Sequence, residues 1–165
     1  MTMARAGDDT VVCIAPMRSE DLDRVLQIEA RSFTLPWTAE MFLAERNRRE
    51  KGEIFVARTV EHGVTGAVVG YLCLWLIGED LHITNIAVDP ARRRRGLGAR
   101  LLRFAMEWAR SHTAERITLE VRASNHVAQE LYRRFGFRAV GTRRHYYDRP
   151  REDALIMTLE PIPPS

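Results

Sequence analysis

The sequence predicts one α/β domain in which about seven strands and about four helices follow one another along the chain. Three observations predict it. A length of 165 residues is typical of a single domain. Hydrophobic residues make up 45% of the chain and charged residues 28%, the balance of an ordinary globular protein. Segments with strand spacing alternate with segments of helical spacing, and no repeat or linker separates them.

The first third of the chain is expected to form a strand and two helices. Val11 to Ile14 is a short apolar run that ends near Pro16. Ser19 is typical of a helix N-cap. The helix after it has an apolar face at helical spacing, made of Leu22, Val25, Leu26 and Ile28. Thr38 can cap a second helix that runs to about Lys51.

The middle of the chain is expected to contribute three strands. Ile54 to Thr59 and Ala67 to Ile77 are rich in β-branched and aromatic residues. A turn at His62 and Gly63 would join these two segments as an antiparallel hairpin. Leu81 to Val88 follows as a third strand.

The last third is expected to form two helices and three strands. Leu97 to about His112 has apolar residues at helical spacing, and Ile117 to Val121 alternates as a strand. Asn125 opens a helix that stops at Gly136. Two more strands, Arg138 to Tyr146 and Ala154 to Leu159, complete the domain. We expect the domain to span residues 11–160, with flexible tails at 1–10 and 161–165.

Composition argues against several classes of protein. The apolar run from Ala67 to Ile77 is too short to span a bilayer, and Met1 to Gly7 lacks the apolar core of a signal peptide. We therefore expect a cytoplasmic protein without membrane partners. Cys13 and Cys73 are far apart and no CxxC spacing occurs, so we expect two buried thiols, no disulfide and no metal site.

Positive charge is concentrated in one part of the chain. The formal net charge is +3, and Lys51 is the only lysine among 25 cationic residues. Arg92 to Arg151 holds 16 arginines against five acidic residues, a local charge of +11, which leaves −8 for the remainder. Arginine favours phosphates, whether of a nucleic acid or of a phosphorylated cofactor, and the acidic remainder favours a cationic ligand. Solvated surfaces explain the same counts equally well.

Two glycines stand where a strand gives way to a helix. Gly96 and Gly98 can turn the backbone tightly and bring its N–H groups against an anion at the helix N-terminus, as in a pyrophosphate cradle. No Gly-Lys-Ser/Thr follows, so this is not a Walker loop, and Leu101 occupies the place of the third glycine of a dinucleotide fingerprint. The four adjacent arginines before Gly96 could instead be a nucleic-acid patch, although no nucleic-acid-binding motif accompanies them.

The spacing Arg93-x-x-Gly96-x-Gly98 matches the Q/R-x-x-G-x-G/A signature of the GCN5-related N-acetyltransferases (GNAT), and the order of elements resembles that family from about Val11 to Glu160. Six further blocks resemble its RimI subfamily, which acetylates the N-terminal alanine of a small-subunit ribosomal protein. They are Phe33 to Trp37, Asn85 to Pro90, Leu119 to Asn125, Leu131 to Phe137, Arg144 to Tyr147 and Arg151 to Ala154. The chain departs from the subfamily in His145, where Asn is common, and in Asp148-Arg149-Pro150, which lacks the usual glycine.

The resemblance implies a twisted, mixed and mostly antiparallel sheet in which two strands splay apart to bind acetyl-CoA. A bulge near Asn85 to Val88 would separate them, and a backbone N–H there would meet the thioester carbonyl. The cofactor-binding residues it implies are Ile86, Ala87, Val88, Arg93, Arg94, Arg95, Gly96, Leu97, Gly98, Ala99, Asn125 and Tyr132. Asn125 could equally serve only as a helix cap.

The resemblance also implies two catalytic residues. Glu120 would be the general base, acting through water, and Tyr132 would be the general acid that protonates the coenzyme A thiolate. From the sequence alone, Glu120 could instead pair with Arg122 or another arginine, and Tyr132 could be a core tyrosine. An N-terminal amine is the easier acceptor, because its pKa of about 7.8 leaves far more neutral amine at pH 7 than a lysine pKa of about 10.4.

The acceptor-binding residues that the resemblance implies are Glu29, Trp37, Asn85, Tyr146 and Tyr147, although packing could explain each aromatic. The acidic remainder of the chain suits a basic partner, such as the N-terminus of a ribosomal protein. Two alternatives remain open: a GNAT enzyme acting on a lysine, a polyamine or an antibiotic, and an arginine-rich RNA-binding module. No specific nucleic acid is expected as a partner of the enzyme.

Overall fold

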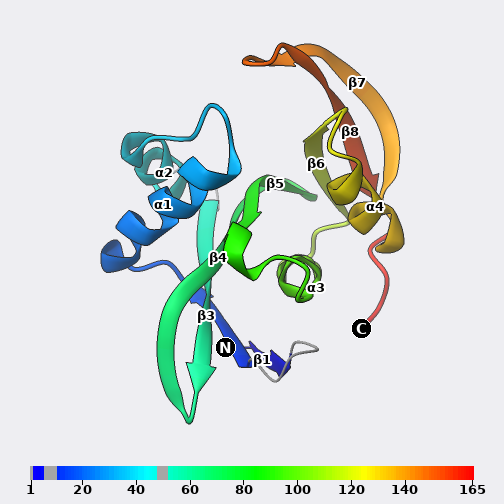
Figure 1. The fold of residues 1–165 in the computed structure, drawn as a ribbon. Helices are drawn as coiled ribbons and strands as arrows, with labels where there is room; N and C mark the ends of the chain where they lie inside the picture. The colour runs from blue at the N-terminus through cyan, green and yellow to red at the C-terminus, as the bar shows by residue number, and fades with distance from the viewer. Residues whose placement is uncertain (1, 6–10, 48–51) are drawn as a thin grey trace.

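The structure is a computed structural model that describes residues 2–5, 11–47 and 52–165. Its centre is one twisted sheet, in which the described strands lie in the order β1-β2-β3-β4-β5-β6-β8-β7 (Figure 1). The strands are β1 (Thr2–Arg5), β2 (Val11–Pro16), β3 (Gly52–Glu61), β4 (Val64–Ile77), β5 (Asp80–Val88), β6 (Arg116–Arg122), β7 (Arg138–Tyr147) and β8 (Glu152–Leu159). Only β5 and β6 pair in parallel, so the predicted mixed, mostly antiparallel sheet is confirmed.

Four α-helices and two short 3₁₀ turns occupy the described residues. They are η1 (Ser19–Asp21), α1 (Leu22–Ser32), α2 (Ala39–Arg46), η2 (Pro90–Arg92), α3 (Leu97–Ser111) and α4 (His126–Arg134). Two predicted caps are confirmed, because Thr38 Oγ1 accepts from the backbone N–H of Met41 at 3.3 Å and Asn125 Oδ1 accepts from that of Ala128 at 3.2 Å. Gly136 has the positive φ of +96° that a C-terminal stop requires.

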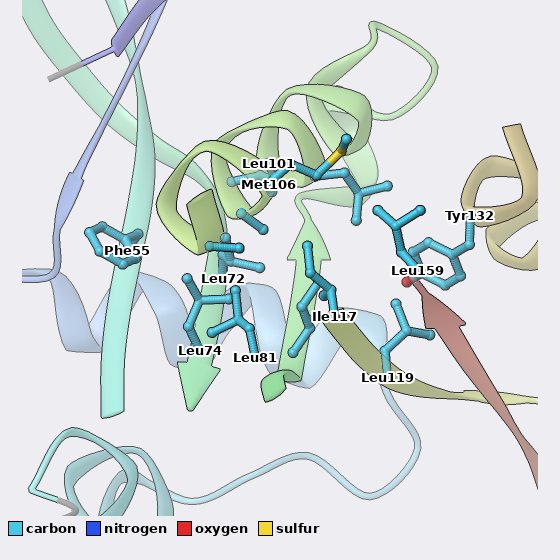
Figure 2. Packing of buried hydrophobic residues seen from close by; sticks show 14 of the residues in the cluster. Phe55, Leu72, Leu74, Leu81, Leu101, Met106, Ile117, Leu119, Tyr132 and Leu159 are labelled. Carbon is cyan, nitrogen blue, oxygen red and sulfur yellow. The ribbon is translucent and has the colours of Figure 1, made fainter. Parts of the chain in front are cut away.

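The sheet has an apolar cluster on each face. Along β4, Tyr71 and Cys73 belong to the cluster beneath α1 and α2, whereas Leu72 and Leu74 belong to the larger cluster beneath α3. Figure 1 shows the two helix pairs on opposite sides of the sheet. Figure 2 shows part of the larger cluster, in which Tyr132 of α4 lies beside Leu159 of β8. Each side chain on β5 and β6 therefore faces either the helix pair α1 and α2 or the helix pair α3 and α4. Only side chains on the same face can contact one another.

The structure adds detail at the ends of the predicted domain. Thr2–Arg5 pairs with β2 as an edge strand, so the described sheet has eight strands where the sequence predicts about seven. The predicted flexibility of the N-terminal tail falls partly on residues 1 and 6–10, which lie outside the described residues, as do residues 48–51 at the predicted end of the second helix. In the C-terminal tail, the backbone O of Pro163 accepts from Arg110 Nε at 2.7 Å. Flexibility of both tails stays a prediction.

Cys13 and Cys73 are free and buried, as predicted. No helix in the described ranges is long and apolar enough to cross a membrane. In the same ranges, His, Cys, Asp and Glu side chains form no group of three or more that could hold a metal ion.

Candidate active site

The sheet splits open between β5 and β6. These strands pair only from Asp80 with Arg116 to Ile83 with Leu119, after which no further pairing joins them. The split begins at a bulge in β5, where Thr84 is skipped between the pairs Leu74 with Ile83 and Cys73 with Asn85. The edge of β5 that carries Ile86, Ala87 and Val88 therefore faces a gap, as the resemblance implies.

The junction from β5 to α3 presents backbone N–H groups at the start of a helix. Gly96, the residue before α3, has a φ of +74°, a left-handed conformation that glycine adopts without strain. Its backbone O accepts from the N–H of Arg100 at 3.2 Å, which starts the helix. The N–H groups of Leu97, Gly98 and Ala99 lie in the first turn of α3, where a helix has no carbonyl partner for them. These backbone donors fit a pyrophosphate.

Gly98 allows α3 and α4 to approach closely. A Cβ atom at Gly98 would lie 3.2 Å from Cδ2 of Leu131 on α4, closer than ordinary packing. A Cβ at Gly96 would meet nothing within 4 Å, so only the φ of that residue requires glycine. Gly96 is thus required for its backbone conformation, and Gly98 is required for the close packing of two helices.

The arginine run is held by contacts with α1 and β5. Arg93 Nε donates to the backbone O of Val88 at 3.3 Å, and its Nη2 donates to Ser32 Oγ at 3.3 Å. Arg93, Arg94 and Arg95 are all exposed. Arg94 has a φ of 63°, which is uncommon for a residue with a side chain.

Asp89 anchors the start of this loop and was not singled out by the sequence. Its buried carboxylate pairs with Arg24 and, at 3.0 Å, with Arg31, both on α1. It also accepts from the backbone N–H of Ala91 at 3.1 Å. Burial raises the pKa of Asp89, but the Ala91 hydrogen bond and the two arginines outweigh burial, so its pKa is lowered. Asp89 is therefore an ionised anchor between α1 and the loop.

Tyr132 has a buried ring and an unpartnered hydroxyl. The side chain is 7% exposed, and its ring lies 5.9 Å from that of Phe137. No hydrogen bond from another described residue reaches its hydroxyl, although buried tyrosines ordinarily have such a partner. Burial raises the pKa of Tyr132 to about 12. A phenol that stays protonated and lacks a protein partner can donate to a group that enters the gap.

Glu120 lies on the opposite face of β6 from the apolar Leu119 and Val121, as predicted. Its side chain is 8% exposed, and Oε2 lies 2.6 Å from Nε2 of His82 on β5. Arg143 Nε lies 3.4 Å from Oε1. Burial raises the pKa of Glu120, but the hydrogen bond and charge of His82, together with Arg143, outweigh it and lower the pKa.

The expected pairing of Glu120 with Arg122 or another arginine is thus met by another arginine, and a histidine joins it. Arg122 pairs with Glu152 at 3.2 Å, while Arg143 is the arginine near Glu120. His82 was not singled out by the sequence. It alternates with Leu81 and Ile83, which face the larger core, so the pattern did place it on the same face as Glu120. What the pattern could not show is that the two strands bring them into contact.

Glu29 joins three of the predicted acceptor-side segments. The carboxylate is 1% exposed and accepts from the backbone N–H of Trp37 at 3.0 Å, from Asn85 Nδ2 at 3.0 Å and from the hydroxyl of Tyr71. Burial and the charge of Glu29 raise the pKa of Tyr71, so its hydroxyl stays a donor. Trp37 packs on Phe42 with ring centroids 5.1 Å apart. Glu29 therefore fixes the loop between α1 and α2 against the bulged part of β5.

Tyr146 and Tyr147 lie at the end of β7 and pack edge to face, with centroids 5.0 Å apart. Burial raises the pKa of Tyr147, and the neighbouring Tyr146 and the charge of Glu120 raise it further. Burial also raises the pKa of Tyr146, followed by the charge of Glu120. Arg143, which lies 3.4 Å from Glu120, also has its Cζ 5.7 Å from the ring centroid of Tyr146. Tyr146 remains 50% exposed and can meet a ligand.

The predicted residues thus divide between the two faces of the split. The glycine loop, the start of α3 and Tyr132 belong to the face of α3 and α4. Glu120, Glu29 and Asn85 belong to the face of α1 and α2. The split therefore lies between a face that carries the start of α3 and a face that carries Glu120.

Comparison with known proteins agrees with this arrangement. Residues 22–137 match the model of the acetyltransferase (GNAT) family. A Bacillus subtilis (strain 168) protein, provisionally named ribosomal protein bS18-alanine N-acetyltransferase, is 42% identical over 148 residues, covering 90% of this chain and 95% of the relative. The N-alpha-acetyltransferase RimI of Mycobacterium tuberculosis (strain H37Rv) is 33% identical, covering 96% of this chain and 99% of the relative.

A solved structure is similar over the same length. The crystal structure of the ribosomal-protein-S18-alanine N-acetyltransferase from Escherichia coli has a TM-score of 0.79 and 31% sequence identity to this chain. The alignment covers 93% of this chain and 96% of the other. The solved structure therefore resembles this chain in fold, in length and in sequence.

Proposed function

The chain belongs to the acetyltransferase (GNAT) family, and from that membership we propose that it transfers an acetyl group from acetyl-CoA to the N-terminal alanine of ribosomal protein bS18. The relatives named for this activity cover nearly the whole chain. The observation that carries the proposal is the split between β5 and β6, which has the N–H groups of a helix start on one face and Glu120 on the other. A cytoplasmic location fits an enzyme that acts on ribosomal proteins.

The chain's own residues fit acetyl-CoA, which supplies the acetyl group as an activated thioester. The N–H groups of Leu97, Gly98 and Ala99 would hold its pyrophosphate, with Arg93 to Arg95 contributing positive charge nearby. The open edge of β5 at Ile86 to Val88 would hydrogen-bond the pantetheine arm, and a backbone N–H there would stabilise charge on the thioester oxygen. Asn125 would contact the cofactor in addition to capping α4.

Glu120 serves as the base in this proposal. An N-terminal amine is largely protonated at neutral pH and must lose a proton before it can attack the thioester. Glu120 is ionised and held in place by His82 and Arg143, so it can take that proton through a bridging water. Its lowered pKa means that it returns the proton readily to solvent.

Tyr132 serves as the acid. The coenzyme A thiolate has a pKa of roughly 8.5, below the value of about 12 for Tyr132. Proton donation is therefore favourable only together with cleavage of the carbon–sulfur bond, and it requires a nearby phenol that no protein group already occupies. The free hydroxyl of Tyr132 meets that requirement within the described structure.

The acceptor would lie on the face of α1 and α2. Glu29 holds Trp37 and Asn85 in place. Tyr146 packs on Tyr147 and lies near Arg143, the arginine that contacts Glu120. The acidic balance of the chain outside Arg92 to Arg151 suits a cationic peptide.

The decisive experiment compares acceptors. The protein would be incubated with acetyl-CoA and with matched peptides that begin with Ala, Ser or Met, and the acetyl group would be located by mass spectrometry. The central pair consists of a peptide with the bS18 N-terminal sequence and a version of that peptide that is blocked at its α-amine but carries lysine. We expect acetylation of the free N-terminus only. Acetylation of the blocked peptide on lysine would overturn N-terminal selectivity.

A further inference from the structure

Arg122 is the last residue of β6 and lies two residues after Glu120, so both side chains project from the same face of the strand. Its guanidinium covers the ring of Tyr147, with Cζ 4.3 Å from the ring centroid. Nη1 lies 3.3 Å from the backbone O of Pro150, and Nη2 lies 3.4 Å from that of Asp148. Arg122 thus holds the turn between β7 and β8 by three contacts.

The same guanidinium reaches a second loop. Its Nη2 donates to Thr34 Oγ1 at 3.4 Å, although Thr34 stands 88 residues earlier in the chain, between α1 and α2. Figure 1 shows this loop and the turn between β7 and β8 at the same end of the molecule. Loops of this kind ordinarily move independently of each other. A shared partner makes the position of each depend on the other.

Contacts with Glu152 and Gln129 fix the position of Arg122 itself. Nη1 pairs with Glu152 Oε2 at 3.2 Å, and Glu152 Oε1 accepts from the backbone N–H of Ser124 before α4. The Ser124 hydrogen bond lowers the pKa of Glu152, so the carboxylate stays ionised. On the backbone side, Gln129 of α4 donates to the O of Arg122 at 2.9 Å. The arginine therefore links both loops to the helix that carries Tyr132.

We propose that Arg122 is a positioning residue that joins the loop at Thr34 to the turn at residues 147–152 as one rim, and thereby sets how the first residues of the acceptor lie against Glu120. The proposal rests on the proposed function only for the identity of the acceptor. Its physical basis is the planar guanidinium, which can contact two loops, a carboxylate and an aromatic ring at once. A lysine ammonium keeps the charge but cannot reproduce that set of contacts.

Thr34→Val offers the most selective test, because it removes one hydroxyl and keeps the branched shape. Thr65→Val, at an exposed threonine on β4, is the matched control. Initial rates would be measured with a six-residue peptide beginning with Ala and, separately, with alanine amide. We expect Thr34→Val to raise KM for the peptide about threefold to tenfold, with kcat and KM for acetyl-CoA within about twofold of wild type.

Arg122→Lys should raise the peptide KM further, because a positive charge alone does not restore the guanidinium contacts that join the two loops. Alanine amide is too short to reach the rim, so its KM should change less in both variants. An unchanged peptide KM in Arg122→Lys, or equal changes for the peptide, alanine amide and acetyl-CoA, would overturn the proposal.

Hydrogen exchange tests the rim independently of the acetylation reaction. In the protein without substrates, Thr34→Val should speed amide exchange in residues 147–152, which are remote in sequence from the change. Unaltered exchange there would overturn the rim, even if the enzyme acetylates N-termini normally. If no peptide is acetylated by the wild-type protein but exchange responds as expected, the proposed function fails while the rim stands.

Discussion

The Nε2 atom of His82 lies 2.6 Å from Oε2 of Glu120, across the last paired residues of β5 and β6. Two lone pairs would repel at this distance, so a proton lies between the atoms. The contact orients the carboxylate and, with Arg143 at 3.4 Å from the other oxygen, keeps its pKa low despite burial. Glu120 is therefore ionised throughout the neutral pH range, and the acid limb of kcat/KM should follow the acceptor amine.

Removing His82 should change the pH dependence of turnover. His82→Leu takes away the hydrogen bond that lowers the pKa of Glu120, so burial will raise that pKa. Glu120 must be ionised to accept a proton, and the acid limb of kcat should therefore move to higher pH. His82→Gln keeps a neutral donor and should move the limb less. Identical kcat profiles from about pH 5 to pH 8 for both variants and wild type would argue against this coupling.

Glu120→Gln tests the base directly. The amide keeps the shape of the side chain but cannot accept the proton, so kcat should fall roughly 10²-fold or more. Because the wild-type carboxylate titrates below the neutral range, the limb of kcat/KM that reflects the acceptor amine should stay near its pKa of about 7.8. Steady-state rates against pH would show both effects, and near-normal turnover would remove Glu120 from the mechanism.

Tyr132→Phe separates a general acid from a core tyrosine. The ring packs in the larger core, while the hydroxyl has no described partner, so the variant should change the free energy of unfolding by less than about 1 kcal/mol. If the hydroxyl protonates the thiolate, kcat should fall roughly 10²-fold while acetyl-CoA still binds. Calorimetry gives the binding, denaturant unfolding gives the stability, and unchanged kcat would assign Tyr132 to packing alone.

The two glycines of the loop show how far the sequence could predict the site. Their spacing correctly indicated a tight turn before a helix, because the positive φ of Gly96 is a local property, whereas binding of an anion at this turn stays a prediction. The reason for Gly98 is Leu131 on a later helix, which spacing cannot show. The same limit explains why Asp89 was missed, since its partners Arg24 and Arg31 lie 65 and 58 residues away.

The strand faces were predictable for a similar reason. Alternation of Leu119 and Val121 placed Glu120 correctly, and the N-cap role of Asn125 needed only its neighbours. The split was expected only from the resemblance. The apolar alternation of β5 changes phase between Ile83 and Ile86, at the bulge, but the sequence does not show that pairing with β6 ends there. The edge strand at Thr2–Arg5 depends on pairing with β2, and its sequence contains no apolar run that would predict a strand.

Gly98→Ala should act through α4. The added methyl would press on Leu131 at 3.2 Å, and relief requires α4 to shift or Leu131 to change rotamer. We expect weaker acetyl-CoA binding and a loss of stability on the order of 1 kcal/mol. Leu131→Ala in the same chain removes the contact, so the double variant should recover the part of the binding loss that packing causes. If the second substitution restores no binding, Gly98 is required by the cofactor itself.

Asp89→Asn should weaken the anchor of the loop. Because the folded protein lowers the pKa of this carboxyl, its ionised form stabilises the fold above the unfolded pKa of about 3.9, and this stabilisation disappears as pH falls through the lower folded value. At pH 7 the variant should lose on the order of 1–3 kcal/mol, since the carboxylate is buried with two arginines. Below about pH 4 the difference should shrink. Denaturant unfolding at both pH values measures it, with Glu130→Gln as an exposed control; a pH-independent difference would contradict the ionised anchor.

The final prediction concerns the arginine run, whose charge the sequence assigned either to cofactor phosphates or to a nucleic acid. Replacing Arg93 and Arg94 by glutamine removes two exposed cations beside the start of α3, so KM for acetyl-CoA should rise and its dependence on salt should flatten. Arg93 also contacts Val88 and Ser32, and therefore Arg94→Gln alone separates the loss of charge from the loss of loop contacts. Arg138→Gln, at an exposed arginine on β7, controls for net charge. Steady-state kinetics at low and high salt, beside an RNA-binding titration, measure the outcome. A fall in RNA affinity with no change in KM for acetyl-CoA would assign the run to nucleic acid instead.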